Sequence, residues 1–250
     1  MLKYIVAYAR AVLLLVHTAL HMTALYVHAL FYRGDKDLIG FRYRRLWAQR
    51  ALKILGIKVV EEQVHQHDGG ALYISNHRTL TDPIIQLGYF DSYVIAKSDV
   101  GGLPIIGAGA RMTGLILVDR ANSDSRQSAL KKIEELLASG KSVLVYAEGT
   151  TTVERKTGQF KIGTFKAAAT LGVPVVPIAI EYRDSKDYWL ADKLSVQMIG
   201  QVGTGPTHTK LHIGKAISDD DPQGLLNRTQ TWIDASLADM QKDWSRVFQP

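Results

Sequence analysis

The 250-residue sequence contains no cysteine, which excludes disulfide bonds, a cysteine nucleophile and thiolate metal sites. It also lacks a Gly-x-Ser-x-Gly pattern, the turn that presents the nucleophilic serine of many hydrolases. A covalent catalytic mechanism therefore has no evident nucleophile in this chain. Low-complexity tracts and repeats are also missing, and 46% hydrophobic and 22% charged residues are typical of a folded protein.

Acidic residues are scarce at the start of the chain. Residues 1–58 hold ten Lys or Arg and two Asp, a net charge of +8, whereas residues 59–250 carry a net charge of −2. Positive charge beside an apolar segment favours contact with an anionic membrane surface. The slightly acidic remainder contains no groove-reading motif, which argues against nucleic acid as a partner.

Residues 4–31 form an apolar segment that is long enough to span a bilayer. The segment does not resemble a secretory signal, because the run is long and no small-residue cleavage site follows it. On a helix, Arg10, His17, His21 and His28 fall on one stripe. The stripe predicts a polar seam against a neighbouring helix or at the interface. The alternatives are a lipid head-group contact or a metal pair at His17 and His21.

A second, basic segment follows from Ile39 to Ile57. It combines an interfacial tryptophan and apolar residues with Arg42, Arg44, Arg45, Arg50 and Lys53. Such a helix can lie on anionic lipid. We therefore predict that residues 1–57 form a membrane-associated helical pair, on the cytoplasmic face of the inner or plasma membrane by the positive-inside tendency. Spanning and dipping geometries of the first helix both fit this pattern.

From residue 58 on, strand-like runs alternate with helical patterns. The runs are Lys58–Glu62, Ala71–Ser75, Tyr93–Ala96, Leu115–Val118, Val143–Ala147, Val175–Ile180, Leu194–Ile199 and Lys210–Ile213. Helices are expected from a cap at Asn122 or Ser123 through Leu137, over Thr164–Leu171, and over Pro222–Val247. This alternation predicts that residues 58–250 form an α/β domain with a central, mostly parallel sheet flanked by helices. In such sheets the site lies beyond the carboxyl ends of the strands.

A His-x4-Asp pattern, His77 and Asp82, directly follows the run Ala71–Ser75. An imidazole can accept a proton near neutral pH, so His77 suits a general base for a hydroxyl. Two structural alternatives stand beside this interpretation. His77 could instead bond a loop carbonyl, and Asp82, which precedes Pro83, could be a helix N-cap.

Three further motifs follow in order: Gly114–Arg120 (GLILVDR), Val145–Thr151 (VYAEGTT) and Val173–Ile178 (VPVVPI). Together with His77 and Asp82 they resemble the glycerolipid acyltransferase family, the PlsC-like lysophosphatidate (1-acyl-sn-glycerol-3-phosphate) acyltransferases. The resemblance covers roughly residues 70–180. Ala96-Lys97 and Pro104…Gly107 are also similar to the stretch that connects the first two motifs in this family.

The resemblance implies transfer of a fatty acyl group from acyl-CoA or acyl carrier protein to the free hydroxyl of a lysolipid in the membrane. A thioester is already activated and needs only a deprotonated alcohol held against it. His77 would then be the base, and Asp82 would orient its ring and stabilise the imidazolium. This scheme involves no covalent intermediate, no cofactor beyond the acyl donor and no metal.

Acceptor binding is assigned by the same resemblance to Arg120, Glu148, Gly149, Thr150 and Lys161. A guanidinium at position 120 suits a phosphate, although Asp119 and Arg120 could also form a surface turn. Glycine at 149 allows the backbone to approach a ligand closely. Glu148 could bond acceptor hydroxyls or fix the loop.

The motif Val145–Thr151, the third counting from His77 and Asp82, departs from the family at one position. Phosphate-acceptor members commonly read Phe-Pro-Glu-Gly-Thr-Arg, whereas this chain has the uncharged Thr151 in place of the arginine. Either Arg120, Lys161, or Arg155 and Lys156 supply the missing charge, or the acceptor is another lysolipid, such as lyso-ornithine lipid or a different lysophospholipid. We expect lysophosphatidate, which gives phosphatidate.

Two rival functions use the same residues. In a thioesterase, His77 would activate water, whereas a non-catalytic lipid-binding protein would have no need to keep His77, Asp82 and Glu148. A shielded, membrane-facing site favours transfer over hydrolysis.

Overall fold

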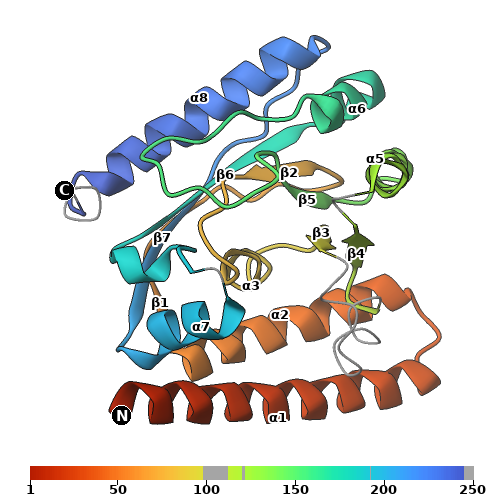
Figure 1. The fold of residues 1–250 in the computed structure, drawn as a ribbon. Helices are drawn as coiled ribbons and strands as arrows, with labels where there is room; N and C mark the ends of the chain where they lie inside the picture. Colours follow the sequence, from red (N-terminus) through yellow and green to blue (C-terminus); the bar gives the residue numbers. More distant parts are fainter. Residues whose placement is uncertain (98–111, 120–121, 192, 245–250) are drawn as a thin grey trace.

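A sheet of seven strands forms the centre of the described part of the chain, in the order β1-β7-β6-β2-β5-β3-β4 (Figure 1). The structure is a computed structural model that describes residues 1–97, 112–119, 122–191 and 193–244. The strands are β1 (Ile57–Val64), β2 (Leu72–Ser75), β3 (Tyr93–Lys97), β4 (Leu115–Val118), β5 (Val143–Tyr146), β6 (Val175–Tyr182) and β7 (Thr207–Ile213). Neighbouring strands are parallel except for the antiparallel pair β6–β7.

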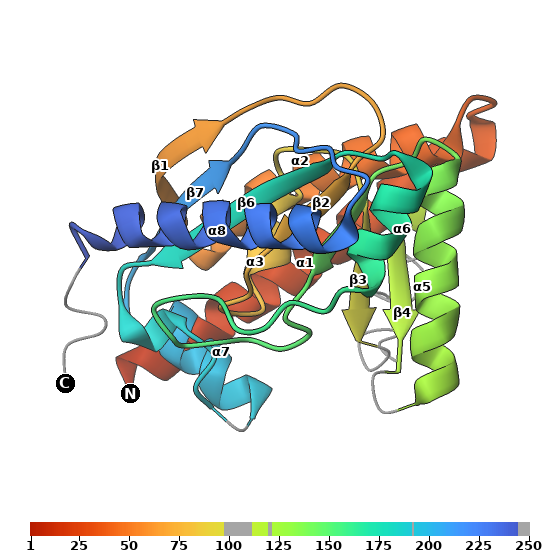
Figure 2. The same ribbon diagram turned by 90° about the horizontal axis from the view of Figure 1, so that it is seen from above.

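Helices cover both faces of this sheet. They are α1 (Leu2–Phe31), α2 (Lys36–Leu55), α3 (Asp82–Gln86), α5 (Ser123–Ala138), α6 (Gly163–Leu171), α7 (Leu194–Gly203) and α8 (Pro222–Gln241), with a 3₁₀ turn at Ser185–Asp187. In Figure 1, α6 and α8 lie above the sheet, and α3, α7, α2 and α1 lie below it. Figure 2 shows α8 crossing the sheet from above, with α5 and α6 beside it. The predicted α/β class is confirmed.

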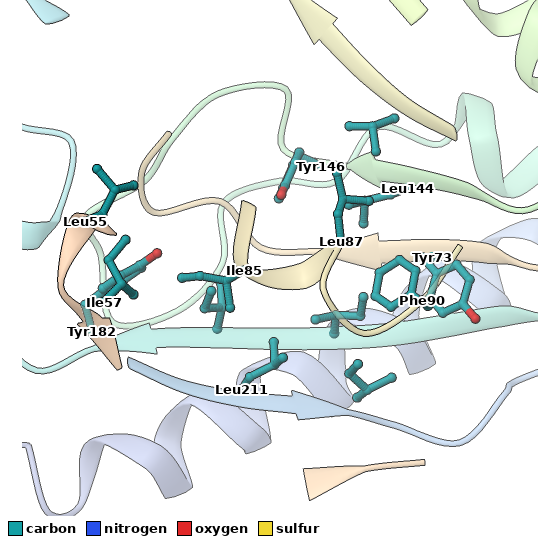
Figure 3. Packing of buried hydrophobic residues seen from close by; sticks show 14 of the residues in the cluster. Leu55, Ile57, Tyr73, Ile85, Leu87, Phe90, Leu144, Tyr146, Tyr182 and Leu211 are labelled. Carbon is teal, nitrogen blue, oxygen red and sulfur yellow. The ribbon is translucent and has the colours of Figure 1, made fainter. Parts of the chain in front are cut away.

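Each face of the sheet has its own apolar core, because successive side chains of a strand point to opposite faces. In β2, Leu72 and Ile74 pack with residues of α5, α6 and α8. Tyr73 of the same strand belongs to the opposite core, together with Leu55 of α2 and Ile85 of α3. Figure 3 shows this second core, whose side chains come from elements far apart in the sequence.

The register of the central strands sets the position of the loops that follow them. Ser75, the last residue of β2, lies opposite Tyr146, the last residue of β5, and opposite Ile178 of β6. The two loops after β2 and β5 therefore leave the sheet side by side at the same edge. His77 and Glu148 both lie two residues beyond this matched pair.

One predicted element is wrong: Leu194–Ile199 is not a strand but the first part of helix α7. The segment alternates apolar and polar residues, which mimics a strand over a short window. Its helical period becomes visible only when the next turn is included. Gln197 and Gln201, spaced by four residues, are then both buried, as residues on one face of a helix are.

The first helix, α1, is long and apolar enough to cross a membrane by length and composition, and 11% of its most apolar window is buried. Its polar stripe forms the predicted seam against other helices. His21 Nε2 donates to the Tyr43 carbonyl of α2 at 2.7 Å, and Arg10 donates to the Val202 carbonyl of α7. Gly203 allows α7 to approach α1 closely, since a Cβ there would lie 2.5 Å from the Lys3 carbonyl oxygen.

Candidate active site

The loop that follows β2 folds back on itself and brings His77 against Asp82. The Nδ1 atom of His77 lies 2.7 Å from Oδ2 of Asp82, and both side chains are buried. A carboxylate oxygen can only accept, so Nδ1 carries the hydrogen, and in the neutral imidazole Nε2 is left with a lone pair. The ring of Tyr146 stacks on the imidazole, with centroids 4.0 Å apart, and restricts its orientation.

Four hydrogen bonds hold the Asp82 carboxylate. Besides His77, Oδ2 accepts from the backbone N–H groups of Arg78 at 2.6 Å and Thr79 at 3.0 Å. The other oxygen, Oδ1, accepts from the Tyr182 hydroxyl at 2.6 Å. Both backbone donors precede Asp82 in the chain, whereas an N-cap accepts from residues that follow it. The geometry therefore fits an orienting carboxylate and does not fit a cap.

Tyr182 is a functional candidate that the sequence patterns did not reveal. Its hydroxyl lies within hydrogen-bonding distance of both Asp82 and Thr81. Complete burial, followed by the negative charge of Asp82, raises the pKa of the Tyr182 phenol well above its usual value. The phenol therefore stays protonated and remains a donor to Asp82. No local signal marks it, because it is the last residue of a fully buried strand, in which a tyrosine is an ordinary core residue.

The Glu148 carboxylate joins two loops at the end of β5. Its Oε1 accepts from the His77 backbone N–H at 3.1 Å, and its Oε2 accepts from the Gly158 N–H at 2.7 Å. Of the two roles suggested by the sequence, the structure supplies contacts for the loop-fixing one. Glu148 thereby ties the segment carrying His77 to the segment that leads to Lys161.

Gly149 and Lys161 come together directly beside Glu148. Gly149 has a φ of +74°, a left-handed conformation that favours glycine. A Cβ at this position would lie 2.5 Å from Nζ of Lys161, so the ammonium group rests against the bare backbone. Thr150 is exposed in the same turn. Three of the predicted binding residues thus lie together, with Thr150 adjoining them.

Arg120 lies outside the described residues, as do Pro104 and Gly107 of the connecting stretch. The strand before Arg120, β4, is the third strand from β2 in the sheet. At about 4.8 Å per strand, this places the end of β4 roughly 14 Å from the end of β2. Its carboxyl end lies on the same edge of the sheet as His77.

A buried ion pair supports the loop from beneath. Arg78 is fully buried, and its guanidinium lies 3.1 Å from Glu181 Oε2 of β6 while donating to the Thr152 and Glu154 carbonyls. Glu181 also accepts from Gln241 of α8 at 2.7 Å. Arg78 lies within the His-x4-Asp pattern. Its ion-pair partner Glu181 is 103 residues away and could not be predicted from the sequence.

Two amides complete the support of the loop. The side chain of Asn76 donates to the Ile180 carbonyl and accepts from the Ile180 N–H, both at 2.9 Å, and so joins β2 to β6. Gln201 of α7 donates to the Thr81 hydroxyl at 3.1 Å. Through Gln201 the helix that packs on α1 also touches the loop between His77 and Asp82.

A cavity of about 870 Å³, with both polar and apolar lining residues, opens next to Glu148 and Lys161. Its opposite wall is one face of α8, from which Gln223, Asn227 and Gln230 extend. These amides can donate and accept, and they carry no charge. The cavity therefore places the Lys161 ammonium group opposite uncharged amides, of which Gln223 donates to Asn227 and Gln230 donates to Thr157 and Gly158.

Metal ligation has no support within the described residues, which contain no group of three or more His, Asp or Glu side chains that could hold an ion. His17 and His21 are near neighbours, with ring centroids 5.3 Å apart. His21 already uses Nε2 to bond the Tyr43 carbonyl.

Comparisons with known proteins bear on the family of this chain. The Acyltransferase family model matches residues 56–181, a stretch that contains His77, Asp82 and Glu148. A chloroplastic 1-acyl-sn-glycerol-3-phosphate acyltransferase of Brassica napus is 36% identical over 120 residues, which cover 48% of this chain and 35% of the relative. A lyso-ornithine lipid O-acyltransferase of Rhizobium meliloti is 30% identical over 145 residues, or 55% of this chain and 50% of the relative.

The fold has a solved counterpart in the crystal structure of the 1-acyl-sn-glycerophosphate acyltransferase PlsC from Thermotoga maritima. The two structures superpose with a TM-score of 0.79 over 97% of each chain, at 18% sequence identity. This likeness concerns the fold. The stretches that match the two curated relatives span a third to a half of those relatives' length.

Proposed function

The chain belongs to the Acyltransferase family, whose model matches half of its length, and on this premise we propose that it transfers a fatty acyl group to the free hydroxyl of a lysolipid. The donor is a thioester, either acyl-CoA or acyl carrier protein. The single observation that carries the proposal is the buried His77–Asp82 pair at 2.7 Å, which leaves Nε2 of His77 as a proton acceptor.

The reaction needs one proton acceptor and no protein nucleophile. Nε2 of His77 takes the proton of the acceptor hydroxyl while its oxygen attacks the thioester carbonyl carbon. When the tetrahedral intermediate collapses, the C–S bond breaks, and the imidazolium returns the proton to the departing thiolate. Asp82 stabilises the transient imidazolium, and such general-base catalysis contributes about 10²–10⁴ in rate.

We propose lysophosphatidate as the acceptor. The relative from Brassica napus is named for this chemistry, and Lys161 places a cation against Gly149 of the third motif. Lyso-ornithine lipid is the second candidate. It is favoured by Thr151 in place of the usual arginine, by the uncharged amides of α8 and by the similarity to the Rhizobium meliloti enzyme.

The location proposed for the reaction is the membrane surface on its cytoplasmic face. The exposed apolar surface of α1 and the basic residues of α2 support this placement. A lysolipid acceptor also resides in the bilayer, so a membrane-held enzyme meets its substrate there.

The test is acyl transfer from labelled acyl-CoA to a panel of lysolipids, with the His77→Ala variant in parallel. Label in phosphatidate that disappears with His77→Ala supports both the acceptor and the base. Label only in diacylated ornithine lipid supports the mechanism with the second acceptor. Label released only as free fatty acid would show a thioesterase and overturn the proposal.

A further inference from the structure

The two N-terminal helices enclose a cavity that the proposed reaction does not use. Figure 1 shows α1 and α2 running side by side beneath the sheet. Between them lies a cavity of about 490 Å³. We call it the helix-pair cavity and define it by His21, His28 and Tyr32 of α1 and by Arg42, Tyr43 and Arg50 of α2.

No residue of the catalytic loop, from His77 to Asp82, lines the helix-pair cavity. The catalytic loop contacts α7 through Gln201, and α7 meets α1 near Arg10. Ala24, at the centre of the α1 side of the cavity, follows Arg10 by 14 residues. At 1.5 Å per residue this is a separation of about 20 Å along the helix. The cavity is therefore a separate site.

The charge of the cavity is of one sign. No Asp or Glu is among the described residues that line it. Arg42 and Arg50 are always charged and offer only donors, and neither forms an ion pair or hydrogen bond with another described residue. By contrast, Arg44 of the same helix donates to the Thr113 carbonyl, and Arg45 pairs with Asp91 at 2.7 Å.

This contrast separates structural arginines from arginines with spare donors. On α2, the arginines that face the domain are bonded to it. The two that line the cavity, Arg42 and Arg50, are exposed, so their guanidinium groups are open to solvent and to a ligand. An anion with several acceptor oxygens, such as a phosphate, matches such donors in geometry and charge.

The rim of the cavity is apolar. Leu38 and Leu46 line it and are 57% and 42% exposed, and the neighbouring Leu20 and Phe31 of α1 are 68% and 80% exposed. Exposed apolar residues around a cationic hollow match an amphipathic ligand, whose anionic end enters while its chains cover the rim. A free phosphate ion would leave this rim uncovered.

We propose that the helix-pair cavity binds the phosphate head group of an anionic bilayer phospholipid, whose acyl chains lie over the apolar rim. This lipid is not a substrate, because neither His77 nor any other residue of the catalytic loop lines the cavity. It seats the helical pair at a defined depth in the membrane surface and selects anionic membranes.

The test is native mass spectrometry of the full chain in detergent, with phosphatidylglycerol or phosphatidylcholine added at equal concentration. Retention of one phosphatidylglycerol in preference to phosphatidylcholine is expected. Arg42→Gln combined with Arg50→Gln should weaken it roughly 30-fold, since each basic group at a lipid surface contributes about fivefold. Lys36→Gln combined with Lys53→Gln is the matched control: it removes two exposed cations of α2 outside the cavity and should change binding less than about threefold.

Two further arms separate the alternatives. Lys161→Gln should leave the adduct unchanged, whereas its loss would place the lipid at the acceptor site. Inorganic phosphate, compared with chloride at equal ionic strength, should not displace the lipid. Displacement would show a site for free phosphate. Equal losses of lipid binding in the Arg and Lys double variants would mean diffuse electrostatic attraction. Any one of these three results would overturn the proposal.

Discussion

Replacing Asp82 by Asn tests the geometry around His77 more sharply than removing the base does. The amide has the shape of the carboxylate but only one acceptor oxygen. Oδ2 faces three N–H donors, from His77, Arg78 and Thr79. Oδ1 faces one hydroxyl, that of Tyr182. A hydroxyl can reverse its role and accept, whereas an N–H group cannot.

The amide oxygen of Asp82→Asn is therefore expected on the three-donor side, where it still accepts from Nδ1 of His77. The tautomer with a free Nε2 is retained, and only the charge is lost. A hydrogen bond to a charged group contributes about 1.5–3 kcal/mol, against about 0.5–1.5 kcal/mol for a neutral one. The difference of about 1–2 kcal/mol corresponds to a loss of roughly 5–30-fold in kcat.

His77→Ala removes the proton acceptor itself and should lower kcat by about 10²–10⁴. The assay is steady-state acyl transfer from acyl-CoA to the accepted lysolipid, with thermal unfolding of each variant as the folding control. A folded Asp82→Asn variant that is as inactive as His77→Ala would refute the argument, because the amide nitrogen would then face the imidazole. A His77→Ala variant within a few-fold of wild type would refute the base itself.

Three other variants test separate parts of the structure. Burial raises the pKa of Asp187 from 3.8 to about 6, so the folded state holds its proton more tightly and the contribution of this group to stability falls as pH rises from about 4 to 6. The free energy of unfolding of Asp187→Asn, measured with urea, should therefore rise relative to that of wild type by on the order of 2–3 kcal/mol between about pH 4 and pH 7, because one pKa unit is about 1.4 kcal/mol. A difference that does not change with pH would contradict this. Arg78→Met should lower the free energy of unfolding by about 3–5 kcal/mol, because it leaves Glu181 buried without its partner, and adding Glu181→Gln should restore part of the loss; no restoration would show that the lost packing dominates. Lys161→Gln should raise KM for lysophosphatidate roughly tenfold with a smaller change in kcat, whereas an effect on kcat alone would place Lys161 outside acceptor binding.

The sequence was sufficient for the parts of the fold that depend on local pattern. The run that became β2 ends at Ser75 as expected, and β5 ends at Tyr146, one residue before the predicted Ala147. The site residues follow these strands because a parallel sheet collects loops at one edge. The helix from the Asn122 cap through Leu137 also formed as predicted, and the Asn122 side chain accepts from the N–H groups of Asp124 and Ser125. Capping and periodicity are encoded within a few residues of each other.

The parts that sequence reasoning missed depend on contacts across long stretches of chain. Tyr182 lies 100 residues from Asp82, and Gln201 lies 120 residues from Thr81. Nothing within either local segment indicates the other, since these contacts exist only once β6 and α7 have taken their places. The incorrect strand over Leu194–Ile199 has the same origin. Gln197 bonds to Tyr188 and Leu190, and Gln201 in the next turn bonds to Thr81, so the buried face of α7 is set by segments outside it.

The positions of the nearby cations determine how a phosphate can be bound when Thr151 replaces the usual arginine. Arg78 follows His77 directly but is committed to Glu181 and to two backbone carbonyls, so it has little capacity left for a phosphate. Lys161 instead rests on Gly149, two residues before Thr151. An ammonium is a point charge on a flexible stem and does not impose the paired hydrogen bonds of a guanidinium. We infer that this site restricts the orientation of the charged acceptor head group less than a site with arginine at position 151 would. This is consistent with the similarity of the chain to enzymes named for two different lysolipids.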